Sequence, residues 1–183
     1  MSLTVPVTRD DHLRGLEDAL VAMVEYGDYE CGYCSLAHPI VNTVQRHFGT
    51  QLCFAFRHFP LSQAHPHATM AAEAAEFAGA HGKFWEMHDL LYENQERLSP
   101  ALFAELAEHL ELPLAELGNV LQNGTYTTKI RRDFLGGVRS GVNGTPTFFI
   151  NGVRHDGSYL FEDLVAAINK SMPLQLQSQG RHG

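Results

Sequence analysis

The sequence predicts an α/β fold that carries an all-helical insertion between its β-strand regions. Three observations predict it. The first 60 residues follow a strand–helix–strand pattern, residues 65–139 contain helical patterns with no strand, and β patterns return around Asn151-Gly152. The chain has 183 residues, 44% hydrophobic and 19% charged, which suits one domain with an inserted subdomain and a sizeable core.

The N-terminal strand–helix–strand pattern is bounded by clear breaks. Residues 19–26 (ALVAMVEY) form a short apolar run, typical of a strand buried on both faces and interrupted by Glu25. A helical pattern follows Cys31 and contains Pro39, and residues 51–59 (QLCFAFRHF) form the next strand candidate. Two strands joined by a helix predict a parallel βαβ unit.

The middle of the chain changes to helical patterns only. The predicted helices span residues 68–80, 83–97, 101–110, 113–121 and 125–138. Ser99-Pro100 supplies a favourable N-cap and first helical residue for the third of them. Because this block has no strand of its own, we predict an insertion that covers one face of the sheet.

A glycine-rich loop near residue 140 precedes the last β patterns. Residues 147–151 and 153–155 flank Asn151-Gly152, the strongest short hairpin signal, and residues 161–171 form a final helix. The predicted organisation is a discontinuous domain of residues 1–64 and 140–173, an inserted helical domain of residues 65–139, and a flexible tail of residues 174–183.

Cys31 and Cys34 form a Cys-x-x-Cys motif at the start of the first predicted helix. Unpaired N–H groups and the helix dipole favour a thiolate there, so the pKa of Cys31 should fall below the roughly 8.5 of a free cysteine. Cys34 lies one turn deeper and within reach of Cys31. We therefore predict that Cys31 is the attacking thiol and Cys34 the resolving thiol. The other interpretations are two incidental cysteines or half of a metal site.

Glu25 and Pro146 are further candidates for this site. Glu25 precedes Cys31 by six residues in an apolar strand. Burial would raise its pKa and let it exchange a proton with Cys34, whereas the alternative is an exposed carboxylate at a sheet edge. Pro146 precedes the predicted strand at residue 147, and is either a strand-entry proline or a cis proline facing the cysteines.

The order of these motifs resembles the thioredoxin fold, and the long helical block resembles the DsbA-like family of thiol:disulfide oxidoreductases. The likeness covers about residues 10–171. The fragments that carry it are Val24–Glu30 (VEYGDYE), Cys31–Cys34 (CGYC), Phe84–His88 (FWEMH) and Ser140–Thr147 (SGVNGTPT).

The resemblance implies roles for individual residues. Cys31 and Cys34 would be the redox pair, with no cofactor besides their disulfide. Glu25 would be the buried acid and Pro146 the cis proline. The backbone of Thr145 would pair with an extended substrate strand. The substrate-binding residues would also include Gly32 and Tyr33, between the cysteines.

One departure concerns the redox poise. Strongly oxidising members of the family have a histidine between the cysteines, where this chain has Gly32 and Tyr33. The nearby acids Asp28 and Glu30 should oppose a thiolate if they lie close to it. A moderate poise or a reductase role is therefore expected as much as an oxidase role.

The leading interpretation is an enzyme that exchanges disulfides with protein thiols and has an unidentified redox partner. Two alternatives are a soft-metal chaperone that uses Cys31 and Cys34 as ligands, and a glutathione-dependent enzyme acting on a small molecule. Cys53 is expected to be a buried, unreactive core residue. The eleven histidines show no recognisable ligand spacing, so the sequence predicts no metal site.

Composition narrows the partners. The net charge of −8 and the lack of a basic cluster indicate no nucleic-acid partner. No apolar run approaches the roughly 18 residues of a membrane span. The polar N-terminus lacks the apolar core of a secretory signal, which predicts a cytoplasmic protein. The alternative is a periplasmic or other extracytoplasmic location, if the native N-terminus is missing. The oligomeric state is not predicted.

Overall fold

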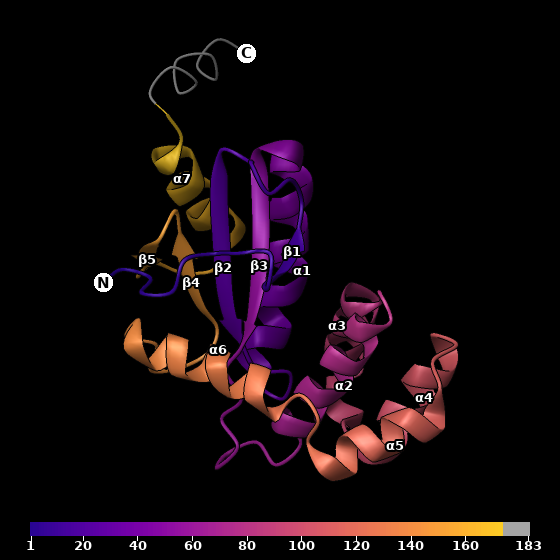
Figure 1. Cartoon of the computed structure of the whole chain (residues 1–183). Coiled ribbons are helices and arrows are strands. Elements are labelled where there is room, and N and C mark those ends of the chain that lie inside the picture. The colour runs from indigo at the N-terminus through magenta and orange to yellow at the C-terminus, as the bar shows by residue number, and fades with distance from the viewer. Residues whose placement is uncertain (174–183) are drawn as a thin grey trace.

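A computed structural model describes residues 1–173, and the predicted tail at 174–183 lies outside this range. Its centre is a five-stranded mixed sheet (Figure 1). The strands, in spatial order, are β1 (His12–Arg14), β3 (Leu52–His58), β2 (Val21–Gly27), β4 (Thr147–Ile150) and β5 (Val153–His155). Within residues 1–173, no helix has both the length and the apolar composition needed to cross a bilayer.

The predicted βαβ unit is confirmed. Helix α1 (Gly32–Phe48) connects β2 to β3, and these two strands are parallel, whereas the other neighbouring strands are antiparallel. The helix continues across Pro39. Both strands are buried almost throughout, which explains their continuous apolar sequence.

The helices lie close to their predicted positions. They are α2 (Ala68–Ala80), α3 (Phe84–Glu93), α4 (Pro100–His109), α5 (Leu114–Asn123), α6 (Thr127–Arg139) and α7 (Phe161–Ser171). Two 3-10 turns, Gly49–Gln51 and Gln95–Arg97, complete the elements. The helix predicted at residues 83–97 is therefore shorter than expected, because α3 stops at Glu93 and the second of these turns follows it. Ser99 caps α4 as predicted, because its Oγ accepts a hydrogen bond from the backbone N–H of Leu102 at 3.2 Å.

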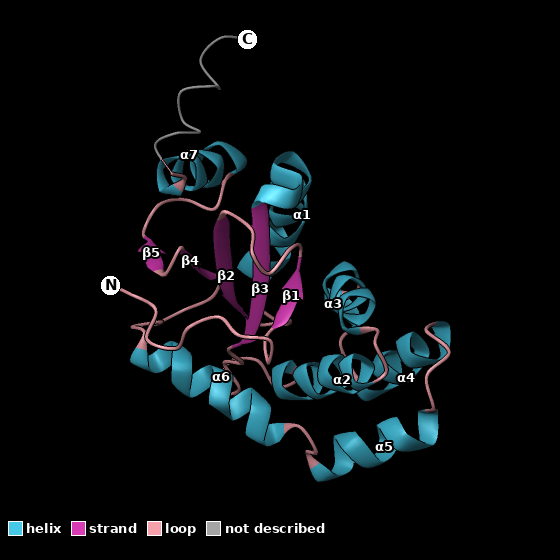
Figure 2. Ribbon diagram, turned by 45° about the horizontal axis from the view of Figure 1, so that its top comes forward, coloured by secondary structure: helices cyan, strands magenta, loops and turns pink. Residues whose placement is uncertain are grey.

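The two faces of the sheet are covered differently, because neighbouring strand residues point to opposite sides. Met23 and Phe56 belong to one large apolar cluster with α1, α7 and the helices α2–α5. Tyr26 lies in a second, smaller cluster, against which Phe134 of α6 packs. Figure 2 shows α1 and α7 on one side of the sheet and α6 on the other.

The expectation that the whole helical block covers one face is therefore wrong for α6. Its close approach depends on Gly137. A Cβ added at Gly137 would lie 2.7 Å from the ring of Phe59 and 3.0 Å from that of Tyr26. The absence of a side chain at this position lets the helix backbone rest on the aromatic rings of the second face.

Strand β1 was not predicted. It contains three residues and pairs antiparallel with β3 at the edge of the sheet. The segment before it is held by Arg57 of β3, whose guanidinium binds the Asp11 carboxylate at 2.7 Å and donates to the carbonyl oxygens of Val5 and Pro6. This strand forms through tertiary contacts, and three residues are too few to give a periodic pattern.

Candidate active site

The two cysteines lie where β2 passes into α1. Cys31 is the N-cap residue, in extended conformation, and Cys34 is in the first turn of the helix. The turn is closed by backbone hydrogen bonds from Cys31 N–H to the carbonyl of Asp28 at 3.1 Å, and from Cys34 N–H to the carbonyl of Cys31 at 3.0 Å. The chain thus presents Cys31 to the free N–H groups of a helix N-terminus.

Cys31 is a thiol with a strongly lowered pKa. The hydrogen bond from the Cys34 thiol has the largest effect on the pKa of Cys31 and lowers it. Desolvation by burial raises this pKa, but hydrogen bonds from the Thr145 side chain and from the backbone N–H groups of Cys34 and Tyr33 also lower it. The resulting pKa of Cys31 is about 5. The Thr145 hydroxyl oxygen is buried and has no hydrogen-bond partner within residues 1–173, which leaves its proton available to a thiolate. When protonated, Cys31 donates to the carbonyl of Thr145 at 3.3 Å.

Cys34 has the opposite property. It is fully buried, whereas Cys31 is 6% exposed. Burial raises the pKa of Cys34 well above its usual value, and the Cys31 sulfur and the charge of Glu25 raise it further. At neutral pH the structure therefore combines a slightly exposed thiolate with a fully buried, protonated thiol.

Glu25 lies on β2, opposite Phe56 of β3 and Phe148 of β4. Its side chain is buried, and burial followed by the charge of Cys31 raises the pKa of Glu25 to about 8. Its Oε1 has no hydrogen-bond partner among the described residues. This carboxyl is accordingly protonated at neutral pH, in a position where it influences both sulfur atoms.

The other predicted site residues surround the sulfur of Cys31. The Thr145–Pro146 peptide bond is cis, and Thr145 reaches Cys31 as described above. A Cβ added at Gly32 would meet no atom within 4 Å, and Tyr33 is 66% exposed. The structure therefore brings the predicted residues together around one sulfur that solvent can reach.

Asp28 and Glu30 were expected to oppose the Cys31 thiolate. This expectation is wrong, because each of the two carboxylates is hydrogen-bonded to a histidine. The Asp28 carboxylate lies 2.7 Å from Nδ1 of His65, and the Glu30 carboxylate 3.0 Å from Nδ1 of His67. Desolvation by burial lowers the pKa of His65, but the Asp28 carboxylate and the Cys31 sulfur raise it by more, so the pKa of His65 is raised overall. The sequence did show a dense His65-Pro66-His67 group, but its partners are distant in the chain.

A residue of the helical insertion also reaches the site, and the sequence gave no sign of it. Gln95, in the turn after α3, donates hydrogen bonds to the carbonyl oxygens of Tyr29 at 2.7 Å and Cys31 at 2.9 Å. Gln95 also lines a groove with Gly32 and Leu36 at the start of α1. The insertion therefore supports the cysteine turn and forms one wall beside it.

The comparison with family models shows what class of protein this fold and site define. A model described as thioredoxin matches residues 7–170, so the chain belongs to the thioredoxin family. The predicted thioredoxin-like fold with an all-helical, DsbA-like insertion is confirmed, and the Cys31–Cys34 pair is present in the Cys-x-x-Cys arrangement of that fold.

Solved structures share this fold over almost the whole chain. Oxidised BdbD from Bacillus subtilis matches with a TM-score of 0.83 over 91% of this chain and 95% of that chain, at 24% identity. The α-DsbA1 protein of Wolbachia pipientis matches with a TM-score of 0.79 over 92% and 93%, at 22% identity. At these identities the similarity establishes the fold.

Curated relatives have higher sequence identity. The Na(+)/H(+) antiporter NhaA 1 of Salinispora arenicola is 47% identical over 172 residues, which are 93% of this chain and 26% of that protein. The Na(+)/H(+) antiporter NhaA 3 of Salinispora tropica is 46% identical over 169 residues, with coverages of 92% and 26%. The chain thus spans about a quarter of the length of these relatives.

Proposed function

We propose that this protein is a thiol–disulfide oxidoreductase that exchanges disulfides with protein thiols through Cys31 and Cys34. The observation that carries the proposal is the opposite pKa shift of two adjacent thiols. The pKa of Cys31 falls to about 5, and that of buried Cys34 rises well above its usual value. Such a pair has one sulfur suited to attack or leave and another suited to resolve.

In the proposed oxidation of a substrate, the enzyme begins with a Cys31–Cys34 disulfide. A substrate thiolate attacks Sγ of Cys31, the disulfide bond breaks, and the Cys34 sulfur leaves and takes a proton from Glu25. A second substrate thiolate then attacks the mixed disulfide and releases Cys31 as a thiolate. The substrate loses two electrons, the cysteine pair gains them, and a redox partner must remove them again.

The thiolate of Cys31 favours this direction. A lowered pKa stabilises the reduced form of the pair, so the disulfide form becomes a stronger oxidant. The acids expected to oppose this effect, Asp28 and Glu30, are hydrogen-bonded to histidines. We therefore favour the oxidase direction over the moderate or reductase poise that the sequence suggested.

The substrate we propose is an extended segment of an unfolded or loosely folded protein. Tyr33 and Leu36 are 66% and 61% exposed beside the cysteines, and such apolar side chains suit exposed apolar segments of a chain. The groove beside them is lined by Gly32, Leu36 and Gln95, and the Thr145 backbone lies on Cys31. An extended segment placed there could pair with that backbone.

The test uses substitutions of each cysteine and a reduced peptide with two thiols. Cys31→Ser should abolish peptide oxidation and disulfide reduction alike, whereas Cys34→Ser, mixed with the oxidised disulfide form of the same peptide, should accumulate mixed disulfides on a non-reducing gel. Cys53→Ser is the matched control, because Cys53 is buried in β3 away from the pair, and should keep full activity. Exchange by the Cys31→Ser variant would overturn the proposal.

The same preparation separates the two alternative functions. A soft-metal chaperone needs further ligands near the sulfurs. Residues 1–173 contain two clusters of potential metal ligands, each made of two histidines and one acid, and neither cluster includes Cys31 or Cys34. Copurifying metal that leaves when both cysteines are replaced would favour that alternative. Turnover with glutathione and a small disulfide, but with no peptide, would favour a glutathione-dependent enzyme.

The cellular location predicts the resting state of the cysteine pair. In the cytoplasm, thiols are kept reduced, and an extracytoplasmic oxidase would rest largely as a disulfide. Rapid alkylation of intact cells, followed by counting the modified cysteines, distinguishes the predicted cytoplasmic location from its alternative.

A further inference from the structure

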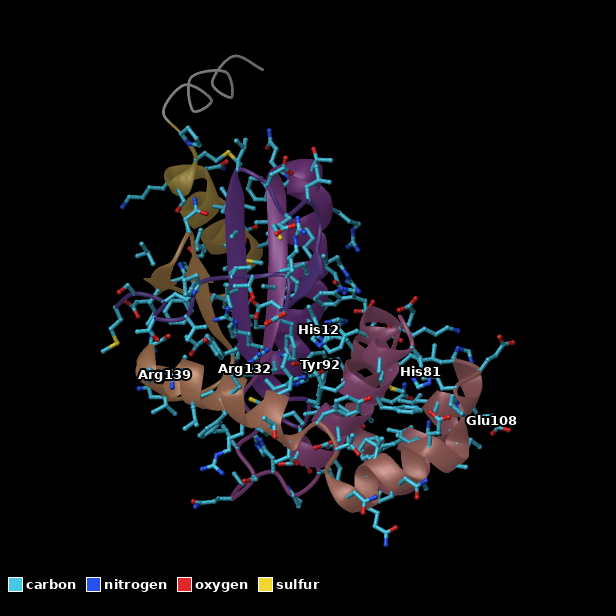
Figure 3. The ribbon with its side chains drawn as sticks, in the orientation of Figure 1. His12, His81, Tyr92, Glu108, Arg132 and Arg139 are labelled. Atoms are coloured by element: carbon cyan, nitrogen blue, oxygen red, sulfur yellow. The ribbon has the colours of Figure 1, made fainter. Side chains whose placement is uncertain are left out.

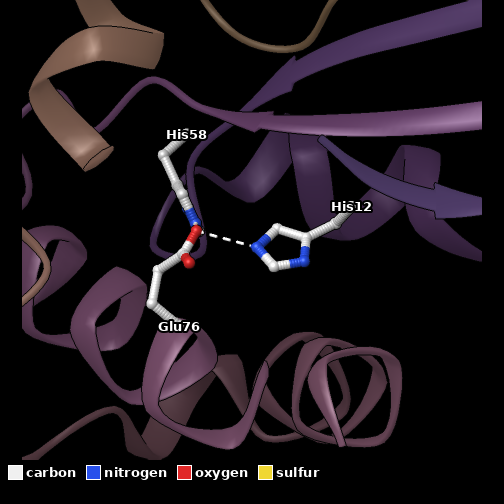
Figure 4. A group of neighbouring side chains, drawn as sticks. All are labelled: His12, His58 and Glu76. Atoms are coloured by element: carbon white, nitrogen blue, oxygen red, sulfur yellow. Dashed lines mark hydrogen bonds and ion pairs between the residues drawn. The ribbon is translucent and has the colours of Figure 1, made fainter. Parts of the chain in front are cut away.

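A second group of reactive side chains lies away from the cysteines, at the junction of the sheet and the helical insertion. His12 comes from β1, His58 from the end of β3, and Glu76 from α2. Figure 3 shows His12 at this junction, and Figure 4 shows the three side chains pointing toward one another. We propose that His12, His58 and Glu76 bind a divalent transition-metal ion of the zinc type and thereby clamp the insertion to the sheet.

The geometry is close to that of a three-ligand site. Oε1 of Glu76 lies 2.9 Å from Nε2 of His12 and 2.8 Å from Nε2 of His58, and all three atoms lie within 4.8 Å of one another. Zinc binds such atoms at about 2.0–2.2 Å in a tetrahedron, which places neighbouring ligand atoms roughly 3.3 Å apart. To admit the ion, the two nitrogen–oxygen contacts would lengthen by about half an ångström, and the two histidine nitrogens, which lie at most 4.8 Å apart, would come to the same spacing.

The imidazole rings are already held in position. The ring of His12 stacks on Phe84, with centroids 3.4 Å apart and planes 5° from parallel. His58 packs edge-to-face against Phe56 at 5.5 Å. A Cβ at Gly79 would lie 3.2 Å from the His12 ring, so the glycine leaves room for that ring. Ligands restrained in this way lose little conformational entropy when an ion binds.

Burial and charge also suit an ion of this class. The side chains of His58, Glu76 and His12 are 1%, 8% and 20% exposed, so the ion would be largely removed from solvent, with access nearest His12. Two imidazole nitrogens and one carboxylate oxygen are ligands that zinc accepts. A fourth ligand, water or an added anion, would complete the shell.

Binding exchanges two hydrogen bonds for three coordinate bonds. Each histidine that now donates from Nε2 must carry its proton on Nδ1, or release it if the ring is charged, so that the Nε2 lone pair can bind the metal. Glu76 supplies the negative charge. Lys129 opposes the ion, because its ammonium nitrogen lies 3.6 Å from Oε1 of Glu76. Asp133 partly offsets this charge, since it pairs with Lys129.

A second group, His38, His88 and Asp89, is less suitable. The carboxylate of Asp89 is paired with Arg14 at 2.9 Å, and Nδ1 of His88 shares a hydrogen bond with the hydroxyl of Tyr29 at 3.0 Å. A metal ion would have to displace the guanidinium from the carboxylate. This second group therefore serves as an internal control for the first.

The experiment measures metal binding by a Cys31→Ser/Cys34→Ser protein, so that the thiolates of the redox pair cannot contribute. The chelator-treated protein is titrated with cobalt(II) and then zinc(II), with absorption spectra and the thermal unfolding midpoint as readouts. We expect one ion per chain, a visible cobalt spectrum without thiolate charge-transfer bands, and an unfolding midpoint raised by about 5 °C or more at a hundredfold excess over Kd.

Three variants assign the site. His12→Gln should weaken binding by more than the roughly 10- to 100-fold lost when a hydrogen-bonding neighbour of a ligand is removed. Lys129→Gln should tighten binding, because it removes the opposing charge, whereas a purely structural cluster would show no such gain. Asp89→Asn should bind like the parent protein.

Two results would overturn the inference. One is a folded parent protein that shows neither a cobalt spectrum nor a shift of the unfolding midpoint at a tenfold excess of metal over protein. The other is binding that survives His12→Gln and is lost in Asp89→Asn, which would place the ion in the second histidine group. Circular dichroism of each variant ensures that only folded proteins are compared.

Discussion

Two buried carboxyl groups, Glu25 in β2 and Glu76 in α2, have opposite properties. Their exposed fractions are 3% and 7%, so burial opposes the charge of both. The pKa of Glu25 rises to about 8, because burial and the Cys31 charge act without compensation. For Glu76 burial acts in the same sense, but hydrogen bonds from His12 and His58 lower the pKa overall. Burial alone does not set the charge state; the partners decide it.

The comparison separates a reactive region from a satisfied one. Around the cysteines, three buried polar atoms lack hydrogen-bond partners within the described residues: Glu25 Oε1, Tyr92 Oη and Thr145 Oγ1. Both nearest histidines of Glu76, in contrast, bind its carboxylate directly. Buried polar groups without partners cost stability, and folded proteins tend to retain them where chemistry requires it.

The largest expected effect is on stability at pH 7. Glu76→Gln should lower the free energy of unfolding by about 3 kcal/mol, because removing one charge from a buried ion pair leaves the others uncompensated. Glu25→Gln should leave stability unchanged or raise it, since folding no longer has to protonate a carboxylate. Urea unfolding of both variants measures the difference. Equal losses in the two variants would contradict the comparison.

The second effect concerns catalysis. Glu25→Gln should slow oxidation of a dithiol peptide by roughly 100-fold at pH 7, which is the lower end of what a positioned general acid contributes. The difference from the parent should narrow as the pH rises and Glu25, whose pKa burial raises above 4.5, itself loses its proton. Stopped-flow rates between pH 6 and 9 test this. A constant ratio across that range would remove Glu25 as the proton donor.

The third effect is a pair of opposite pH profiles, measured on the disulfide form so that Cys31 does not titrate. In this form the Cys31 charge is absent, and burial alone raises the pKa of Glu25 above 4.5 on folding, so the stability present below pH 4.5 falls by roughly 1.4 kcal/mol per pH unit above that value until the folded-state pKa is reached. Glu25→Gln should remove this slope. The pKa of Glu76 is lowered, so its contribution is present above the unfolded value and is lost in acid.

Urea unfolding of the disulfide form between pH 3 and pH 9 tests both slopes. Glu76→Gln should flatten the acid limb alone, and Glu25→Gln should flatten only the limb that begins at pH 4.5 and runs to higher pH. If either substitution flattened the limb assigned to the other, the two carboxyl groups would not act independently.

The sequence could predict the first of the two regions and not the second. Cys31, Cys34 and Glu25 lie within ten consecutive residues, and their strand-to-helix position is visible from local patterns. His12 and Glu76 are 64 positions apart, and meet only because a three-residue edge strand places one beside the helix that carries the other. Local periodicity contains no information about such a contact.

The same limit explains the two corrected expectations. The position of α6 on the opposite face depends on a glycine that allows helix and sheet to approach. The hydrogen bond at the Asp28 carboxylate depends on His65, 37 positions later. In both places the sequence shows the residue itself, a glycine or an acid, but it does not show which distant residue lies against it.

The smallest expected effect comes from Asp28, a third buried carboxylate, which has one histidine partner where Glu76 has two. Its side chain is fully buried, and His65, 23% exposed, lies 2.7 Å from it. His65→Gln removes the positive charge that offsets Asp28 near the Cys31 thiolate. The pKa of Cys31 should therefore rise by about 0.5, or roughly 0.7 kcal/mol, because a partly exposed charge is screened by solvent.

Thiolate absorbance near 240 nm, followed from pH 3 to pH 9, measures this shift. His67→Gln is the matched control, because His67 pairs with Glu30, whose carboxylate is more exposed than that of Asp28. The control should move the pKa of Cys31 less than His65→Gln does. A Cys31 pKa that is unchanged in His65→Gln, or that shifts equally in both variants, would mean that the histidine contributes nothing specific. A single histidine partner would then be insufficient to offset the effect of a buried carboxylate on a neighbouring thiolate.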